Sequence, residues 1–256
     1  MNELEISSLT NDRIKRLVRL KDRTHRDQHG VFVVEGDRLV DKARASGLDP
    51  LEIYVVRGHP LEKHPNSTIV SPGVLDKASY RSRSEGVIAV FKQFSARLSD
   101  LGTGQDPLIL VAESVEKPGN LGAILRAADA VDVTAVVTTG TGVDLFNPNV
   151  IRTSTGAVFS VNHVHSELID LVAWLDDNDI RLVMASPTAD TVYWNADLTG
   201  SLAILVGAED KGVSAEAASL VNDSVAIPMS GTSDSLNVSV SAALLAFEAR
   251  RQRSDH

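Results

Sequence analysis

The sequence predicts an α/β protein built as two domains joined by a linker. Short apolar runs recur along the chain and alternate with segments whose apolar residues repeat at helical spacing, a pattern typical of α/β folds. Residues 96–106 contain no long apolar run and include two glycines, so we expect the linker there. The first domain is then expected at residues 1–95 and the second at residues 107–256.

The first domain is expected to alternate helices with short strands. Residues 8–11 offer capping groups to a helix in which Ile14, Leu17, Val18 and Lys21 repeat at helical spacing. The remaining elements are expected in this order: a strand at 31–35, a helix at about 38–45, strands at 53–56 and 68–70, a helical stretch near 74–78 and a strand at 87–91. These elements are sufficient for a compact α/β unit.

The second domain is expected to contain a mainly parallel sheet. Its strands are predicted at 108–112, 135–138, 181–184, 202–206 and 224–227. Helical segments separate these strands, which implies parallel pairing with helices on both faces of the sheet. The last helix is expected from about Ser235, as its N-cap, to Arg253.

Composition restricts the class of protein. The chain of 256 residues has no cysteine, which excludes disulfides, thiolate metal sites and a cysteine nucleophile, and we expect no metal. No apolar run is long enough to span a bilayer, and the N-terminal residues lack the pattern of a signal peptide, so a cytoplasmic protein is expected. The net charge of −9 argues against indiscriminate coating of nucleic acid.

One basic stretch, from Arg13 to Arg26, stands out from this acidic background. Asp22 is the only acidic residue within it. The candidate phosphate-binding side chains are Arg13, Lys15, Arg16, Arg19 and Arg26, with Lys21 and Arg23 beside them. Two interpretations are open: a solvated surface helix, or a local RNA-binding surface.

Three segments of the second domain each follow an apolar strand. In the first, Asn120 lies in a glycine-rich turn, and Arg126 follows Gly122 by four residues and therefore shares its helical face. In the second, Glu209 is expected near a helix start, where the helix dipole stabilises a carboxylate. Since open α/β sheets bind ligands at the carboxyl ends of their strands, the segments could converge on one pocket.

The third segment, residues 227–239, turns at Pro228 and Gly231 and then carries small polar residues beside Leu236. This mixture suits a ligand with polar and apolar parts. Purely structural roles are open for all three segments: a glycine turn in the first, a cap in the second and a capped helix entry in the third.

The three segments resemble, in order and spacing, the signature motifs of the SpoU (TrmH-like) RNA 2′-O-ribose methyltransferases of the SPOUT superfamily. The matching positions are Asn120, Gly122, Ala123, Ile124 and Arg126; then Gly207, Glu209 and Gly212; then Ile227, Pro228, Met229, Ser235, Leu236, Asn237, Val238 and Ser239. The first domain resembles the L30e-like substrate-binding domain of this family through Asn11, Lys15, Leu17, Leu20, Arg26, Gly30, Val34, Glu35 and Gly36.

This resemblance implies a homodimer that binds S-adenosylmethionine in a deep trefoil knot of the C-terminal domain and methylates a ribose 2′-hydroxyl of RNA. The cofactor would be held by Gly207, Ile227, Leu236, Ser186 and Met229. The catalytic set would be Arg126, Asn120, Glu209, Ser235 and Asn237, and Arg152 matches a position associated with RNA contact.

The substrate expected from the resemblance is ribosomal RNA, most specifically 23S rRNA. A tRNA methyltransferase and a non-catalytic RNA-binding or ribosome-assembly protein are the alternatives. A dinucleotide-dependent oxidoreductase is disfavoured because the chain lacks a Gly-x-Gly-x-x-Gly fingerprint. A guanidinium is always protonated and accepts no hydrogen bond, so we expect Arg126 to stabilise developing alkoxide charge or to bind a phosphate.

Overall fold

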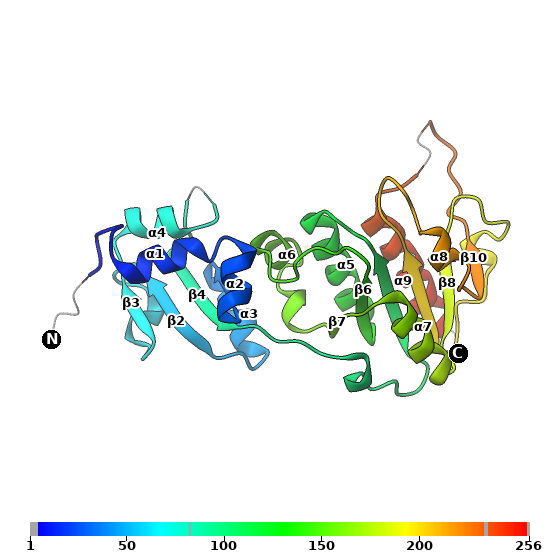
Figure 1. Ribbon diagram of the computed structural model, residues 1–256, viewed down its shortest axis with the longest axis horizontal. Coiled ribbons are helices and arrows are strands. Elements are labelled where there is room, and N and C mark those ends of the chain that lie inside the picture. Colours follow the sequence, from blue (N-terminus) through cyan, green and yellow to red (C-terminus); the bar gives the residue numbers. More distant parts are fainter. Residues whose placement is uncertain (1–4, 82, 233–234, 255–256) are drawn as a thin grey trace. The chain divides into compact units, whose positions relative to one another are not determined.

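The computed structural model describes residues 5–81, 83–232 and 235–254, which fold into two compact units (Figure 1). The first unit contains the chain up to Phe94 together with Asp144–Phe159, and the second contains Ser95–Val143 and the chain from Ser160 onward. Residues 144–159, which lie within the second domain expected from the sequence, therefore pack with the first unit. The predicted α/β class is confirmed.

The first unit is built on a four-stranded sheet in the order β1-β4-β2-β3. Its strands are β1 (Val31–Glu35), β2 (Pro50–Val55), β3 (Ser67–Ile69) and β4 (Val87–Lys92). Strand β4 is antiparallel to both of its neighbours, whereas β2 and β3 are parallel. The helices are α1 (Asp12–Arg19), α2 (Arg23–His29), α3 (Asp37–Ala45), α4 (Pro72–Ala78) and α6 (Pro148–Thr153), with short 3₁₀ turns η1 (Pro60–Lys63) and η3 (Ala157–Phe159).

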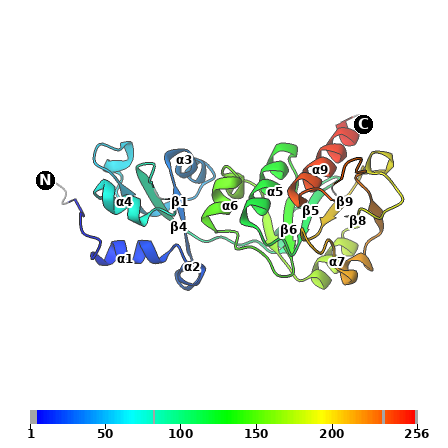
Figure 2. The same cartoon turned by 90° about the horizontal axis from the view of Figure 1, so that it is seen from above.

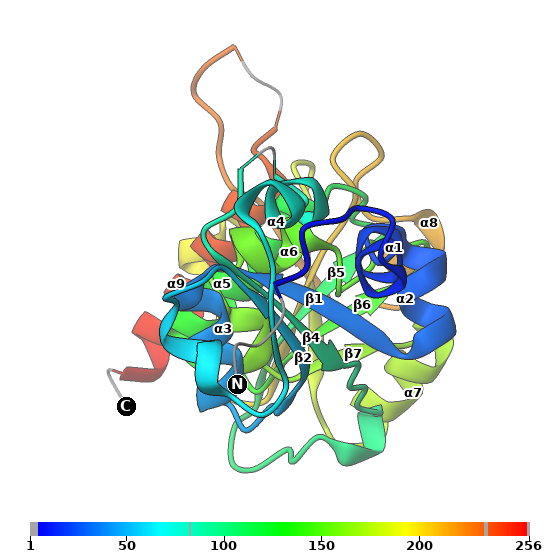
Figure 3. The same cartoon turned by 90° about the vertical axis from the view of Figure 1, so that its left-hand side faces the viewer.

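Helices cover both faces of this sheet (Figures 2 and 3). Ile14 and Leu17 of α1 are buried together with residues of α4 and of the sheet, and the Asn11 side chain caps α1 by accepting from the Arg13 amide. Helices α3 and α6 pack against β1. The apolar residues that repeat at helical spacing in the sequence thus form the buried face of α1.

The segment Asp144–Phe159 contributes aromatic rings to the first unit. Phe32 of β1 stacks on Phe146 with 4.7 Å between ring centroids and also contacts Phe159. Such aromatic pairs contribute about 0.5–1.5 kcal/mol beyond the area that they bury.

Arg26 is buried in the first unit, with 1% of its surface exposed. Its guanidinium donates to the carbonyls of Leu20 and Lys21 and pairs with the Asp144 carboxylate. The sequence analysis placed Arg26 among the RNA contacts, and the structure corrects this, because a buried guanidinium whose two terminal nitrogens are bonded within the unit offers no surface charge. Arg26 and Asp144 form a buried structural ion pair.

The second unit contains a wholly parallel six-stranded sheet in the order β10-β8-β9-β5-β6-β7. The strands are β5 (Leu108–Glu113), β6 (Ala135–Thr139), β7 (His163–His165), β8 (Arg181–Ala185), β9 (Leu202–Val206) and β10 (Asp223–Val225). The predicted parallel sheet is confirmed. The sequence analysis missed β7, which has three residues and two of them histidines.

Helices lie on both faces of this second sheet (Figure 2). They are α5 (Pro118–Val131), α7 (Leu168–Asp177), α8 (Ala215–Ala218) and α9 (Val238–Ser254), with 3₁₀ turns η2 (Leu98–Asp100) and η4 (Tyr193–Asn195). Helices α5 and α9 pack against each other, and α7 contributes Leu171 and Leu175 to the core under the other face. Within the described part of the chain, no helix is long and apolar enough to cross a membrane.

His163 on β7 makes the stability of the fold sensitive to pH. Burial of its imidazole, together with the nearby His165, lowers the pKa of His163 to about 4. Between pH 4 and 6.5 the unfolded chain therefore binds more protons than the folded one. The free energy of unfolding should fall by up to about 3 kcal/mol as the pH drops through this window.

The measurement is urea unfolding of the wild type and of His163→Gln at several pH values. The variant should lose most of this pH dependence, whereas His165→Gln at the exposed neighbouring position should keep it. An unchanged pH dependence in His163→Gln would contradict the assignment.

Candidate active site

Side chains from three distant segments meet in the second unit. The Asn120 amide donates to the Glu209 carboxylate, and the Asn237 amide donates to the Asn120 carbonyl at 3.1 Å. Asn120 is separated by 89 residues from Glu209 and by 117 from Asn237. The convergence that the positions of the loops suggested is therefore present in the structure.

The first of these segments is helical from its beginning. Helix α5 starts at Pro118, a favourable first residue because its fixed φ suits the helix and its missing N–H leaves no bond unmade. Asn120 and Gly122 therefore lie inside the helix. The sequence analysis had expected them in a turn before it, and this expectation was wrong. Arg126 lies further along α5, is exposed, and has no hydrogen bond or ion pair to the side chains that the structure describes.

The second segment folds back on itself directly after β9. The Gly212 amide donates to the Ala208 carbonyl at 2.9 Å, and Gly212 has a φ of +66°. A Cβ on Gly207 would lie 2.1 Å from the carbonyl atoms of Gly212, so only glycine fits at position 207. Glu209 lies in the resulting turn.

The helix after this turn begins later than expected. Helix α8 starts at Ala215, and its N-cap is Ser214, whose hydroxyl accepts from the Ala217 amide. Glu209 is thus not at a helix start, and this expectation was wrong. Its carboxylate instead holds Asn120.

Glu113, at the carboxyl end of β5, binds Ser214, the residue that follows the 207–213 turn. Its side chain is 7% exposed and accepts from the amide and the hydroxyl of Ser214 at 2.8 and 2.6 Å. The sequence analysis did not select this residue. The available signal was a carboxylate that ends an otherwise apolar strand.

The third segment ends in a capped helix. The carbonyl of the Asn237 side chain accepts from the amide and the hydroxyl of Ser239 at 2.9 and 2.6 Å, so Asn237 caps α9. The sequence analysis gave this role to Ser235, which lies two residues earlier and is exposed. Ser233 and Asp234 of this segment lie outside the described residues.

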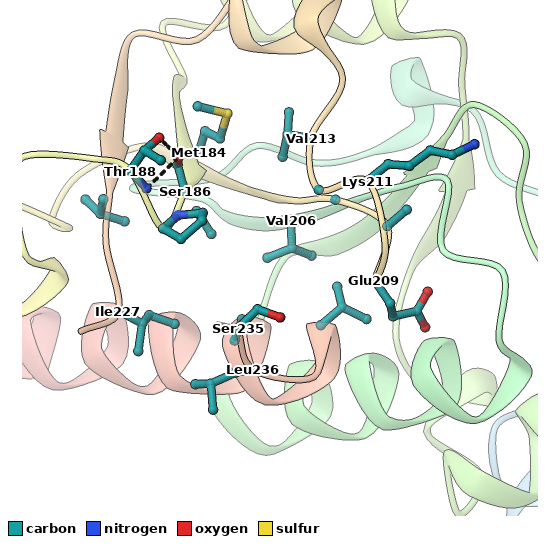
Figure 4. Close-up of a pocket in the computed structure, with 18 of the residues that line it drawn as sticks. Met184, Ser186, Thr188, Val206, Glu209, Lys211, Val213, Ile227, Ser235 and Leu236 are labelled. Atoms are coloured by element: carbon teal, nitrogen blue, oxygen red, sulfur yellow. Dashed lines mark hydrogen bonds between the residues drawn. The ribbon is translucent and has the colours of Figure 1, made fainter. Parts of the chain in front are cut away.

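A cavity of about 570 Å³ opens between these loops (Figure 4). This volume is within the range of small-molecule sites. The walls carry apolar side chains from three segments, and Glu209 and Lys211 lie at one side. All five residues proposed to hold a cofactor line it: Gly207, Ile227, Leu236, Ser186 and Met229.

A comparison with models of known protein families shows to which family the chain belongs. Residues 107–247, more than half of the chain, match the model of the SpoU rRNA Methylase family. The chain belongs to this family. Residues 11–89 of this SpoU methylase match the MRM3-like substrate binding domain.

Individual relatives agree with this assignment. The SpoU methylase is 34% identical over 186 residues to 23S rRNA (guanosine-2′-O-)-methyltransferase RlmB of Escherichia coli, covering 70% of this chain and 76% of RlmB. A solved RNA 2′-O ribose methyltransferase is 42% identical, with a TM-score of 0.86 over 97% of this chain and 99% of its own. The AdoMet-bound rRNA methyltransferase of Sinorhizobium meliloti is 26% identical, with a TM-score of 0.90 over 97% of both chains.

The basic residues predicted to bind RNA lie in the first unit of this SpoU methylase, and some of them are paired with carboxylates. On α1, Arg16 pairs with Glu52, and Lys15 approaches Asp12 at 3.4 Å. Arg13 donates to the Thr68 hydroxyl at 3.2 Å. For Arg19, which is exposed, the described residues supply no partner.

Arg152 is exposed on α6 and donates to the Asn149 side chain at 3.1 Å. Because α6 belongs to the first unit, Arg152 is carried by the same unit as the basic helix α1.

Proposed function

We propose that this SpoU methylase transfers a methyl group from S-adenosylmethionine to a ribose 2′-hydroxyl of ribosomal RNA, in the 23S molecule. The observation that carries the proposal is the hydrogen-bonded series Asn237–Asn120–Glu209, which joins the three family motifs beside the cavity. The names of RlmB and of the AdoMet-bound neighbour support the substrate and the cofactor.

The cavity suits this cofactor. Val206, Ile227 and Leu236 offer an apolar wall for an adenine ring. Of the charged groups that line the same space, the Glu209 and Asp210 carboxylates outnumber the Lys211 ammonium, which favours a cationic ligand. When bound, S-adenosylmethionine supplies an electrophilic methyl group on a sulfonium.

The residues of this chain supply orientation and electrostatics. An Asn amide has two N–H donors, and one donor of Asn120 is used by Glu209 while its carbonyl is used by Asn237. The second N–H of Asn120 is therefore held in a fixed direction, available to a ribose oxygen. The Arg126 guanidinium stabilises the negative charge that develops on the 2′-oxygen as it attacks.

Glu209 and Ser235 have a positioning role in this scheme. Glu209 fixes the Asn120 amide, and Ser235 lines the cavity where the third segment approaches α9. We propose that the deep trefoil knot of the family lies in the segments that line the cavity. These include residues 184–188 and 206–213, together with Val225, Ile227, Met229, Ser235, Leu236, Val238 and Ser241.

The proposal includes a homodimer formed through the second unit. Helix α9 exposes Val240, Leu244 and Phe247, which lie on one helical face, and Phe247 is 53% exposed. An apolar stripe of this kind on the surface indicates an interface. Helix α9 packs against α5, the helix that carries Arg126.

Phe247→Glu should therefore convert a dimer into a monomer, because it places a charge in an apolar interface. The mass in solution, measured by light scattering during size exclusion, checks this. Ile169→Glu puts the same charge at an exposed apolar position on α7, at the other face of the sheet, and is the matched control that should remain dimeric. A monomeric wild type, or a Phe247→Glu variant of dimer mass, would contradict the interface.

The basic face of α1 is proposed to bind RNA phosphates. Replacing Arg16 and Arg19 together by Glu should weaken binding to ribosomal RNA and reduce its salt dependence, by a slope of about 0.7–0.9 for each phosphate contact that is lost. Affinity for S-adenosylmethionine should not change. Unchanged RNA affinity would make α1 a solvated surface helix.

The activity itself is tested with purified protein, tritiated S-adenosylmethionine and unmodified ribosomal or transfer RNA. We expect thermal stabilisation by the cofactor and transfer to a ribose of 23S rRNA, located by its resistance to alkaline cleavage. Transfer to tRNA alone would favour the tRNA enzyme, and binding without transfer would favour an assembly factor. We place the protein in the cytoplasm, with the ribosomal RNA that it modifies.

A further inference from the structure

An exposed aromatic ring lies in the first unit beside two arginines. Tyr80 follows α4 and is 43% exposed. Together with Arg81 and Arg152 it lines a small cleft that also includes Leu39 and Ile151. All of these residues belong to the first unit, although Tyr80 and Arg152 are far apart in sequence.

Tyr80 is held through its backbone and through its hydroxyl. Its backbone amide donates to the Glu35 carboxylate at 2.6 Å, and the same carboxylate accepts from the Ser79 hydroxyl at 2.7 Å. At the other end, the Tyr80 hydroxyl accepts from the Asn149 amide at 3.4 Å. A large side chain exposed to solvent but anchored in this way loses little entropy when a ligand stacks on it.

The two arginines line the same cleft as the ring. The Asn149 side chain that contacts Tyr80 also accepts from Arg152, so one amide links the phenol to a guanidinium. Arg81 is exposed and pairs with Glu85. Arg152, which has no carboxylate partner in the described part of the chain, is the cation best placed to bind an anion here.

We propose that Tyr80 and Arg152 form a binding site for an unpaired nucleotide of the RNA substrate. The ring stacks on the base, and the Arg152 guanidinium binds a neighbouring phosphate, with Arg81 adding positive charge. Aromatic rings flanked by cations bind single-stranded RNA in this manner, because every base has a π-face, whereas paired bases in a duplex are already stacked. This inference rests on the proposed RNA methyltransferase function and makes it more specific: the first unit recognises a loop or bulge and not a regular helix.

The test uses the full-length protein with two fluorescent RNA probes, a 12-nucleotide oligoadenylate and a 20-base-pair duplex of mixed sequence. We expect Tyr80→Ala to weaken binding of the single strand by about 5- to 150-fold, the range found for loss of one stacked base. Tyr80→Phe keeps the ring and should stay within about twofold of the wild type. Tyr80→Leu, which keeps apolar volume without a π-face, should behave like Tyr80→Ala.

Arg152→Ala gives a second readout that folding alone would not change. It should reduce the slope of the salt dependence for the single strand by about 0.7, the value for one phosphate contact. The matched control is Lys92→Ala, an exposed cation at the opposite end of the β1–β4 pair, where Lys92 pairs with Val31 and Ile88 pairs with Glu35. This control should leave the slope unchanged.

The proposal is overturned if Tyr80→Ala binds the single strand as the wild type does, or if it loses duplex binding to the same extent. It is also overturned if Tyr80→Phe is as weak as Tyr80→Ala, since the hydroxyl and not the ring would then matter. Methyl transfer is measured separately: a wild type that shows this binding pattern but transfers no methyl group would refute the proposed function and leave the nucleotide site standing.

Discussion

Arg126→Ala is expected to reduce methyl transfer to ribosomal RNA by at least about 100-fold, the scale of effect seen when a group that stabilises an oxyanion is removed. Its guanidinium is exposed on α5 and is not engaged by side chains that the structure describes, so the charge is available to a substrate. Because Arg126 is not part of the described lining of the cavity, affinity for S-adenosylmethionine should remain within about twofold of the wild type.

The comparison that isolates this role is with Arg126→Lys and Arg250→Ala. Lysine keeps the charge but not the planar fork, so it should restore only part of the rate. Arg250→Ala removes an exposed arginine from α9 and should leave turnover unchanged. Full turnover by Arg126→Ala, or an equal loss of cofactor affinity, would refute the assigned role.

Gly207→Ala is expected to weaken S-adenosylmethionine binding by at least about tenfold and to lower the free energy of unfolding by about 1–3 kcal/mol, the usual cost of overpacking. The added Cβ would lie 2.1 Å from the Gly212 carbonyl atoms and 2.2 Å from the Val213 amide nitrogen. These are backbone atoms, so the clash is relieved only if the 207–213 turn moves, and that turn forms part of the cavity wall.

Gly231→Ala is the matched control, because a Cβ at position 231 meets no atom within 4 Å. It should bind the cofactor as the wild type does, as measured by calorimetry. If Gly207→Ala binds with wild-type affinity, the closed turn is not needed for the site.

Where the sequence predicted well, local pattern was sufficient. Apart from β7, the described strands of both sheets were found because they lie in apolar runs bounded by polar or turn residues, and the predicted bounds of β1 were correct. Strand β7 was missed because three residues carry too little pattern, and its pairing with β6 depends on the rest of the sheet.

The boundaries at the active site were less predictable, because tertiary contacts decide them. Serine and asparagine are both favourable N-cap residues, so local sequence does not distinguish Ser235 from Asn237. Asn237 is the cap in the structure, and it also bonds to Asn120, which is far away in the sequence. Arg26 was counted as a surface charge because sequence spacing does not show burial, which here follows from Asp144. Glu113 and Tyr80 gain their significance from partners that no local pattern connects to them.

The packing of Asp144–Phe159 with the first unit has a consequence for how this protein can be taken apart. The backbone passes between the units three times, after residues 94, 143 and 159. The first unit is therefore not an independent module: a chimaera carrying residues 1–94 alone would leave the Arg26 guanidinium without Asp144 and Phe32 without Phe146. A graft of this unit onto another protein must carry both pieces of chain, Met1–Phe94 and Asp144–Phe159.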